Sequence, residues 1–210
     1  AAYQSARLNL LRVRSDVFFN RGDWERAVGG FDSLRQLAQE SGDRNLADLA
    51  GLYLGASLRR LGRLDEGKEL VEEVLERARE RQDRAIVTRA LGRLASIAWD
   101  DGDWDACERL ANQGLVSASK DLRAPLLVSV AAVQGTRGEL GLATTGLEEA
   151  ESIFRGQVEK RSQSIVLGNL AELLLLQGRF EEALERCELE VRAAGEQHAG
   201  ERAGEAVVGE

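Results

Sequence analysis

The sequence predicts an all-α fold, an α-solenoid of five antiparallel helix pairs. Only one proline, Pro125, occurs among the 210 residues, and long helices exclude interior proline because its ring removes a hydrogen-bond donor and clashes with the preceding turn. Leucine, alanine, glutamate and arginine are abundant, and these residues enter helices at little cost in free energy. A short pattern that begins with glycine also recurs five times. Helical segments interrupted at a regular interval are typical of stacked helical hairpins.

The recurring pattern consists of glycine, a charged residue, a large apolar residue, two variable residues and a small residue. We expect each glycine to end a helix with positive φ, because glycine has no Cβ to oppose it. Asp23 and Asp103 are suited to cap the helix that follows. The large apolar residue should fill the space beneath the turn, and the small residue should mark a close crossing of two helices. The turn glycines, spaced by 40, 40, 36 and 40 residues, are Gly22, Gly62, Gly102, Gly138 and Gly178.

Apolar residues recur at helical spacing on both sides of each turn glycine, which predicts two amphipathic helices per repeat. Helices of about 17 residues account for the long period. The 36-residue spacing indicates that about two residues are missing on each side of the junction at Asp121. Residues 193–210 are interpreted as a tail, either a fraying helix or the start of a further segment. The repeats themselves span about residues 1–42, 43–82, 83–120, 121–158 and 159–192.

The sequence resembles the tetratricopeptide repeat family over residues 8–191. Gly22-Asp23-Trp24, Ala27 and Phe31 match the family pattern. The usual period of 34 residues and the closing proline are absent. Long repeats of this kind are similar to those of bacterial regulators and signalling proteins and of animal cell-polarity adaptors, and the arginine- and alanine-rich composition favours the bacterial group. The resemblance implies a right-handed superhelix that binds proteins or peptides and is not an enzyme. The family's small residue in the first helix of later repeats is matched by Gly55, Ala95, Ala131 and Ala171.

By this resemblance, the first helix of each repeat lines a concave face. Arg89 and Arg93 are four residues apart, so both project from one side of their helix. The middle of the expected groove therefore collects arginine and aromatic side chains within an acidic protein. The positions expected on the concave face, counted back from each turn glycine, are Arg12, Asp16, Phe19, Tyr53, Arg59, Arg89, Arg93, Ser96, Trp99, Ser129, Asn169 and Glu172.

Guanidinium groups suit carboxylates, and aromatic rings offer flat apolar contact. We therefore expect a protein- or peptide-binding scaffold whose ligand is an acidic or C-terminal peptide segment. The alternative for these side chains is structural, with the arginines paired to neighbouring acidic residues and the rings filling gaps between helices. Some members of the family clamp a terminal carboxylate with five residues. Arg89 and Arg93 correspond to the basic pair of that clamp, but Asp16 would repel a carboxylate, so the clamp is incomplete.

A second hypothesis for the function comes from another class. The chain would be the ligand- or peptide-sensing segment of a larger transcriptional or signalling regulator. The formal net charge of −8 disfavours nucleic acid and anionic membranes as partners, because both attract cationic surfaces. No apolar stretch approaches the roughly 20 residues that cross a bilayer. We expect a cytoplasmic protein.

Residues suited to catalysis or metal binding are sparse. The only histidine, His198, lies in the tail without a second ligand at metal-binding spacing. Cys107 and Cys187 occupy small and apolar positions of the repeat, so we expect both thiols to be buried and inert. The sequence therefore predicts no metal, no cofactor and no enzymatic activity.

The last repeat is more apolar than its own core requires. Leu175 and Leu176 are expected to point beyond that core. One interpretation is that the C-terminal segment or a further helix covers them. The other is a homodimer or partner contact through the C-terminal repeat, because large exposed apolar patches usually mark interfaces.

Overall fold

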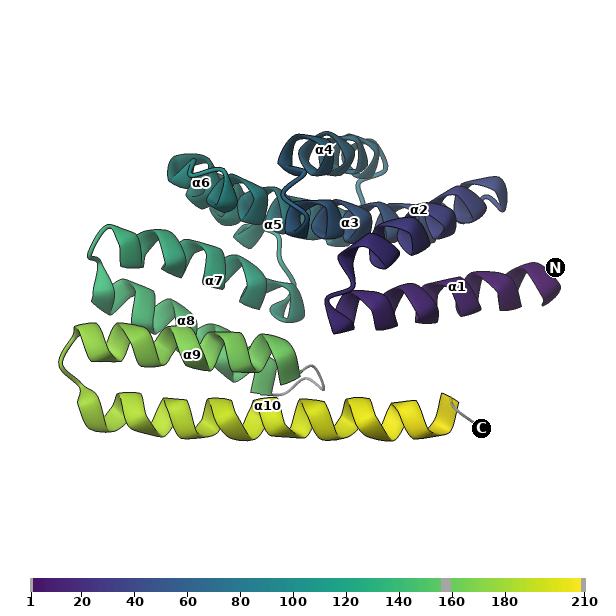
Figure 1. Ribbon diagram of the computed structural model, residues 1–210. Coiled ribbons are helices and arrows are strands. Elements are labelled where there is room, and N and C mark those ends of the chain that lie inside the picture. The colour runs from purple at the N-terminus through teal and green to yellow at the C-terminus, as the bar shows by residue number, and fades with distance from the viewer. Residues whose placement is uncertain (1, 156–159, 209–210) are drawn as a thin grey trace. The chain divides into compact units, whose positions relative to one another are not determined.

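Ten α-helices joined by short turns form the described part of the chain in the computed structural model, which describes residues 2–155 and 160–208 (Figure 1). No strand occurs in these ranges, so the predicted all-α class is confirmed. Most of the helices have the predicted length of 17 residues. The helices are α1 (Ala2–Arg21), α2 (Trp24–Glu40), α3 (Arg44–Arg60), α4 (Leu64–Glu80), α5 (Arg84–Asp100), α6 (Trp104–Leu115), α7 (Lys120–Thr136), α8 (Leu140–Arg155), α9 (Lys160–Leu176) and α10 (Phe180–Val208).

The predicted turns and caps are present. All five turn glycines have positive φ, from 73° at Gly178 to 80° at Gly102. The side chains of Asp23 and Asp103 each accept a hydrogen bond from a backbone N–H in the first turn of the following helix, and Asp43 and Asp83 do the same between repeats. These bonds satisfy donors that a helix leaves open at its N-terminus. The chain therefore reverses direction at the positions expected from the sequence.

The helices group into two compact units. Unit 1 comprises residues 1–117 with α1 to α6, and unit 2 comprises residues 118–210 with α7 to α10. Within unit 1 each helix packs on the next, and α3 also contacts α5. Within unit 2, α8 packs on α7, α9 on α8 and α10 on α9. The first helices α3, α5 and α9 therefore each pack on their own partner and also on the second helix of the preceding pair.

Apolar side chains fill the seams between these helices. Phe31 and Leu34 of α2 belong to a cluster with residues of α1 and α3, and Val71 of α4 belongs to one that reaches Leu91 of α5. In unit 2, Leu170 of α9 is fully buried. Burying a side chain of this size stabilises the fold by roughly 1.5–3 kcal/mol. These seams therefore hold the stack of helices together.

The small residue of each pattern lies at a close crossing, as predicted. Ala27, Cys107 and Ala143 have no exposed surface. The tightest crossing joins α3 to α4, where Gly55 faces Gly67. A Cβ atom added to Gly55 would lie 2.5 Å from Cγ2 of Val71 and 3.2 Å from the carbonyl oxygen of Gly67. Glycine is therefore required here for the two backbones to approach.

The large apolar residue after each turn is less buried than predicted. Trp104 and Phe180 are 46% and 68% exposed, so the expectation that they fill the space beneath the turn is wrong. The physical reason is that each is the first residue of its helix, where the side chain covers the edge of the pair rather than entering the core. Trp24, for example, meets Phe19 of α1 edge-on, with ring centres 5.4 Å apart.

The short repeat spacing arises from one helix. α6 has 12 residues, whereas α7 keeps the 17 residues of the other first helices. The expectation that both sides of the junction lose residues is therefore wrong, because α7 begins at Lys120, 18 residues before its turn glycine, as α3 and α5 do before theirs. The shortened helix ends directly before the division between the two units.

The C-terminal segment is helical. α10 continues from Phe180 to Val208, past the repeat limit at residue 192, and Figure 1 shows it extending well beyond α9. The range predicted as a tail therefore continues the last helix of the array as far as the structure describes it.

Candidate functional site

Two neighbouring first helices of unit 1, α3 and α5, carry most of the arginine and aromatic residues that the sequence singled out. We name Tyr53, Arg59, Arg89, Arg93 and Trp99 the arginine face. Tyr53 and Arg93 each lie nine residues before a turn glycine, so the repeat places them at equivalent positions of adjacent helices. The guanidinium carbon of Arg93 lies 5.4 Å from the centre of the Tyr53 ring. At this distance the ring quadrupole attracts a cation.

Tyr53 is held by a cluster of aromatic rings. It stacks on Phe31 of α2, with ring centres 5.2 Å apart and planes 16° apart, and Phe19 of α1 meets it edge-on at 5.4 Å. Edge-on and offset-stacked pairs are the favoured geometries of aromatic side chains. Phe19 and Tyr53, both predicted on the concave face, are thus in contact, and Tyr53 is a fixed platform beneath Arg93.

Arg59 lies largely out of water. Its side chain is 17% exposed, its Nη1 donates to Oδ2 of Asp100 at 2.7 Å, and the same atom approaches the carbonyl oxygen of Ser96 at 3.5 Å. Burial lowers the pKa of Arg59; the Asp100 carboxylate opposes this effect, and the positive charges of Arg60 and Arg93 add to it. Arg59 therefore has the acidic neighbour that the structural interpretation requires, yet it also adds to a local excess of positive charge.

The rest of the arginine face is more open. Arg89 is exposed one helical turn before Arg93 and forms no ion pair with any residue that the structure describes. Trp99 is half-buried and stacks on Trp104, with ring centres 6.3 Å apart. Ser96 is half-buried, and its hydroxyl donates to the carbonyl oxygen of Gly92 on its own helix. Arg89 is therefore the most accessible side chain of the arginine face.

The predicted positions on α1 hold a charged pair. Arg12 is exposed and Asp16 is half-buried. Burial raises the pKa of Asp16, and the positive charge of Arg12 one turn earlier opposes that rise. An acidic group at this position still opposes the binding of a carboxylate, as the sequence indicated.

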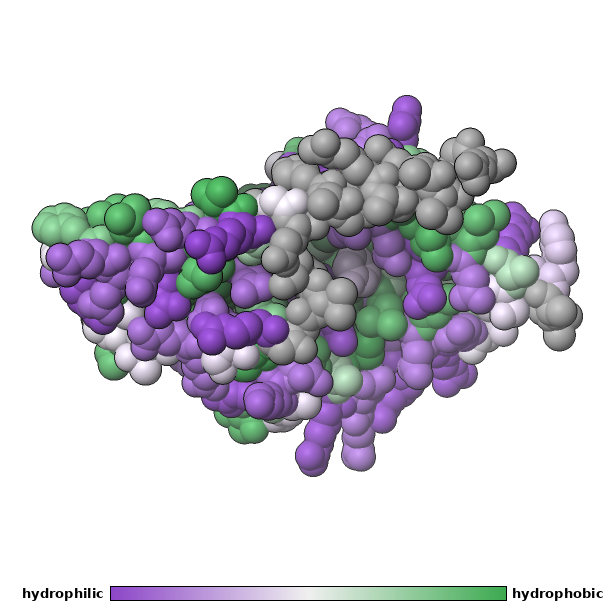
Figure 2. Space-filling view, turned by 90° about the horizontal axis from the view of Figure 1, so that it is seen from below, coloured by the Kyte–Doolittle hydropathy of each residue, from purple (hydrophilic) through white to green (hydrophobic). Residues whose placement is uncertain are grey.

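The predicted positions in unit 2 have a different character. The Ser129 hydroxyl of α7 donates to the carbonyl oxygen of Pro125 at 3.2 Å. On α9, Asn169 is half-buried and Glu172 is exposed, while Leu175 and Leu176 are 50% and 65% exposed. Figure 2 shows scattered green groups of hydrophobic residues on a mostly hydrophilic face of the molecule. These neutral, acidic and aliphatic positions give unit 2 a surface unlike the arginine face.

Sequence reasoning missed Asp100, the partner of Arg59. A signal for it existed. Arg59 lies three residues before Gly62 and Asp100 lies two residues before Gly102, so both stand at the C-terminal ends of adjacent first helices. Comparing repeats in register would have brought the two together, whereas reading each helix separately did not.

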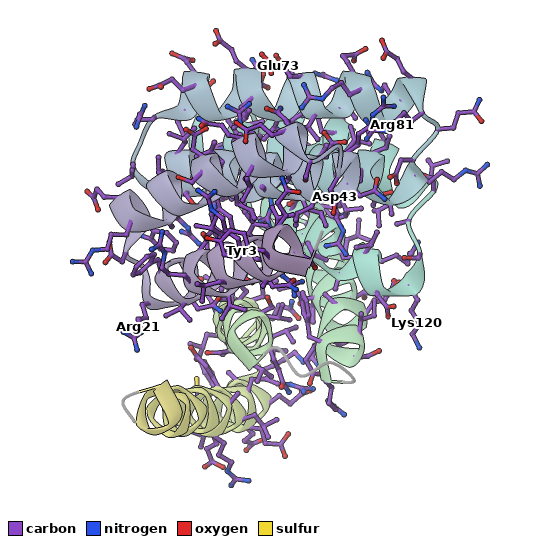
Figure 3. All side chains as sticks on the ribbon, turned by 90° about the vertical axis from the view of Figure 1, so that its right-hand side faces the viewer. Tyr3, Arg21, Asp43, Glu73, Arg81 and Lys120 are labelled. Atoms are coloured by element: carbon purple, nitrogen blue, oxygen red, sulfur yellow. The ribbon has the colours of Figure 1, made fainter. Side chains whose placement is uncertain are left out.

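A second charged cluster lies where α3 begins and α4 ends. Asp48 is buried, its Oδ1 accepts from Nε of Arg77 at 3.3 Å, and its Oδ2 accepts from Arg81. These residues line a cavity of about 270 Å³. Figure 3 shows Arg81 just past the end of α4, whereas Glu73, midway along that helix, points outward. Because two arginines already satisfy the Asp48 carboxylate, the cluster fastens α4 to α3.

Reactive groups are few. Burial, with the charges of Glu108, Asp100 and Asp103, raises the pKa of the Cys107 thiol to about 11, so this thiol is buried as expected. Cys187 is only half-buried, and for it the expectation is wrong, because it lies on an open side of α10. Among the described residues no group of His, Cys, Asp and Glu is placed to hold a metal; His198 lies outside the residues whose side chains are described. None of the described helices is long and apolar enough to cross a membrane.

The family model of the tetratricopeptide repeat matches residues 88–113 and 165–188. These two segments of the chain match the tetratricopeptide repeat. The matched segments contain the turns between α5 and α6 and between α9 and α10, which belong to the third and fifth of the predicted repeats. A search of curated proteins found no match.

Solved structures of proteins with such repeats share the fold. BtubC from P. vanneervenii is 19% identical over 93% of this chain and 82% of its own, with a TM-score of 0.67. A Rap protein complexed with competence and sporulation factor is 12% identical over 87% of this chain and 52% of its own, with a TM-score of 0.76. The Rap conjugation gene regulator of plasmid pLS20, complexed with the Phr* peptide, is 14% identical over 91% and 54%, with a TM-score of 0.78. This chain thus spans about half the length of the two Rap chains, and the likeness establishes the fold.

Proposed function

We propose that the chain is a non-catalytic tetratricopeptide scaffold that binds an acidic peptide segment on the arginine face. The observation that carries the proposal is the position of Arg93, held over Tyr53 and close enough to Arg59 to influence its pKa. Arg89 is exposed one turn away. Cationic groups are thus gathered on adjacent helices of a protein whose net charge is −8.

The physical case rests on charge and on preorganisation. A guanidinium group binds a carboxylate through two parallel N–H donors, and charge-assisted hydrogen bonds of this kind are about twice as strong as neutral ones. The aromatic cluster beneath Arg93 fixes the backbone and Tyr53 before a ligand arrives, so less conformational entropy is lost on binding. Trp99 adds a flat apolar surface for a side chain that flanks the acidic residues.

The Rap structures add support from the same fold. One of them was solved with the Phr* peptide bound, so a stack of helix pairs of this kind is able to bind a peptide. For the present chain, the acidic character of the ligand follows from its own arginines, and a ligand with a free C-terminal carboxylate fits them equally well.

The test is a selection followed by an affinity measurement. Random peptides with free C-termini are selected on the wild-type protein, and the enriched sequences are titrated by fluorescence anisotropy. We expect enrichment of Asp and Glu and a loss of affinity of about tenfold or more for Arg93→Glu, because each 1.4 kcal/mol is a factor of ten. Arg109→Glu, an exposed arginine on α6, is the matched control and should change the affinity less than about twofold. Unchanged binding by Arg93→Glu, or enrichment of basic peptides, rejects the proposal.

A second candidate function is the sensing segment of a larger regulator. It is favoured by the likeness to the Rap conjugation gene regulator. The match covers 91% of the present chain. A sensor must bind its ligand more tightly in one conformation than in another. With one fluorophore in each unit, the sensor hypothesis predicts a change in energy transfer when the selected peptide binds, whereas a static scaffold predicts none.

A further inference from the structure

A cavity at the start of α5 repeats the position of the cavity beside Asp48. We name the cavity beside Asp48 the α3 cavity and the other one the α5 cavity; their volumes are about 270 Å³ and about 390 Å³. The residues that line the α5 cavity, all of unit 1, are Arg79, Gln82, Arg84, Val87 and Ser117. Four of them lie 40 positions after residues that line the α3 cavity, and 40 is also the spacing of Gly62 and Gly102. The four pairs are Gln39 and Arg79, Arg44 and Arg84, Ala47 and Val87, and Arg77 and Ser117. The repeat therefore forms the same hollow twice.

The short helix α6 leaves the α5 cavity more open than its counterpart. α4 has 17 residues and α6 has 12, although both begin two residues after a turn glycine. In the last turn of α4, Arg77 lines the α3 cavity and pairs with Asp48. Its counterpart Ser117 lies past the end of α6 and has only a short hydroxyl side chain. The α5 cavity is therefore larger because the helical turn and the long side chain that fill the α3 cavity are missing there.

The charges of the two cavities differ. Asp48 and Glu80 line the α3 cavity, and Asp48 pairs with both arginines at the end of α4. Thr88 takes the place of Asp48 in the next repeat, and none of the described residues that line the α5 cavity is acidic. Arg79 and Arg84 therefore supply positive charge that the lining of the cavity does not neutralise.

Both of these arginines are available to a ligand. Arg84 is exposed, and it forms no ion pair with any residue that the structure describes. Arg79 donates from Nη1 to Oε1 of Glu76 at 2.7 Å, but the two side chains are 43% and 67% exposed. An exposed pair of this kind is weak, because water competes for both charges. An anion that contacts both guanidinium groups can therefore displace Glu76.

Two polar residues at this place in the repeat cost the fold stability. Gln82 has a φ of 57°, whereas Gly42 holds the corresponding position with a φ of 77°, and a side chain at positive φ is strained. Thr88, one helical turn after Arg84 on the same side of α5, is 2% exposed, and its hydroxyl has no hydrogen-bond partner among the described residues. Strained residues and unsatisfied buried polar groups gather at functional sites, where binding offsets their cost.

We propose that the α5 cavity binds the phosphate group of a small organic phosphate monoester. A monoester carries a charge of about −2 at neutral pH, which the two arginines match, and guanidinium groups bind phosphate oxygens through paired N–H donors. The Gln82 amide and the Ser117 hydroxyl supply further donors for the remaining oxygens. Small-molecule sites occupy roughly 300–1,000 Å³, so the cavity also has room for the organic group. None of its lining residues belongs to the arginine face, and the site does not depend on peptide binding there.

The test is a titration of the full chain, labelled with ¹⁵N, followed by NMR at constant ionic strength. The probes are glycerol phosphate, inorganic phosphate and acetate. We expect saturable shifts of the backbone N–H signals of Gln82, Arg84 and Ser117, with glycerol phosphate binding about tenfold or more tightly than the singly charged acetate. Inorganic phosphate should bind more weakly than glycerol phosphate, because it leaves the rest of the cavity empty. Equal affinity for all three anions, or tighter binding of inorganic phosphate, overturns the proposal.

Three variants test the residues. Arg84→Ala should weaken glycerol phosphate binding about tenfold or more, whereas Arg44→Ala, the matched change in the α3 cavity, should alter it less than about twofold because Asp48 and Glu80 exclude an anion there. Gln82→Gly should weaken binding while the urea midpoint stays the same or rises, because glycine relieves the positive φ. Ser117→Glu, which leaves α5 intact, should abolish binding by adding a carboxylate to the lining. Wild-type affinity in Arg84→Ala or Ser117→Glu, or an equal loss in Arg44→Ala, rejects the site.

Discussion

The first helices of the two units present different surfaces although the same repeat builds them. In unit 1, α3 and α5 bring Tyr53 and Arg93 into contact above a set of stacked rings. In unit 2, the equivalent helices carry Asn169, Glu172 and an exposed Leu175. Turn glycines and small crossing residues occur in both units. The repeat thus fixes where the side chains stand, whereas the residues that the repeat leaves variable decide what a surface can bind.

The units also differ in how closely their helices approach. The α3–α4 crossing leaves no room for a methyl group at Gly55, whereas a Cβ atom on Gly146 of α8 would meet its nearest neighbour, Cβ of Ala131, at an ordinary 3.6 Å.

The buried acidic residues of the two units differ as well. Asp48 pairs with Arg77 of α4 and with Arg81 just past the end of α4, whereas Glu151 pairs with Arg155 on its own helix and, at 3.8 Å, with Arg186 of α10.

The largest expected difference between the units concerns their thiols. The pKa of Cys107 is raised to about 11. At pH 8 its thiolate fraction is therefore smaller than that of a free thiol of pKa 8.5 by a factor of roughly 100 or more. We expect a thiol reagent to modify Cys187 in the native protein and Cys107 only after unfolding. Mass spectrometry of the modified peptides is the measurement, with Cys187→Ser as the control. Rapid native labelling of that control would contradict the burial of Cys107.

The next difference concerns the helix crossings. Gly55→Ala should lower the free energy of unfolding by roughly 2–3 kcal/mol, because the methyl group meets the stiff side chain of Val71 and the backbone of Gly67. Gly146→Ala should be neutral or stabilising by up to about 1 kcal/mol, because alanine favours a helix and space is available. Urea unfolding of both variants measures the contrast. Equal effects would show that the two crossings are equally tight.

A smaller difference is expected for the buried acids. Asp48→Asn should destabilise the protein by roughly 2 kcal/mol, since it removes the carboxylate that pairs with Arg81 and leaves Arg77 with only the exposed Glu73. Glu151→Gln should cost about half as much, because its close partner Arg155 is 63% exposed, so water compensates it, and its second partner Arg186 lies only within 3.8 Å. Chemical unfolding at pH 7 gives both values. The reverse order would mean that the exposure of the partner arginine does not decide the cost of losing the carboxylate.

The smallest expected effect depends on pH. The pKa of Asp16 is raised in the folded state, so the folded protein holds this proton more tightly than the unfolded chain does. Stability is therefore lost as pH rises through the two pKa values, and at neutral pH the charged carboxylate is a modest burden. Asp16→Asn should raise the melting temperature by about 1–2 °C at pH 7. The gain should vanish below about pH 3.9, and a gain that persists there would point to another cause.

Much of the fold could be predicted from the sequence because backbone requirements are local. A glycine with positive φ and an aspartate that caps the next helix are each set by a few neighbouring residues. The repeat multiplied that signal, so the turns at Gly22 and Gly102 were placed correctly. The exposure of Trp104 and Phe180 was not, because burial depends on where a side chain leaves the helix relative to its neighbours.

The candidate site could be predicted only in part. Equivalent positions in adjacent repeats become neighbours, which is why Tyr53 and Arg93 were rightly grouped. Asp100 was missed because its pairing with Arg59 joins residues 41 positions apart and depends on the relative register of α3 and α5. The half-burial of Cys187 was missed for a related reason, since at the same repeat position Phe31 and Val71 are buried under the first helix of the next pair.

The most direct test of peptide binding on the arginine face is a reciprocal charge exchange. An acidic peptide selected on the wild-type protein is measured by calorimetry against wild type and Arg93→Glu, and then again with its critical acidic residue replaced by lysine. Peptide binding through Arg93 predicts that each single change weakens binding about tenfold or more and that the two together restore most of the affinity, because a close charge pair is re-formed in reverse. If the double change is as weak as the sum of the single changes, Arg93 does not contact the acidic residue and the proposed site is wrong.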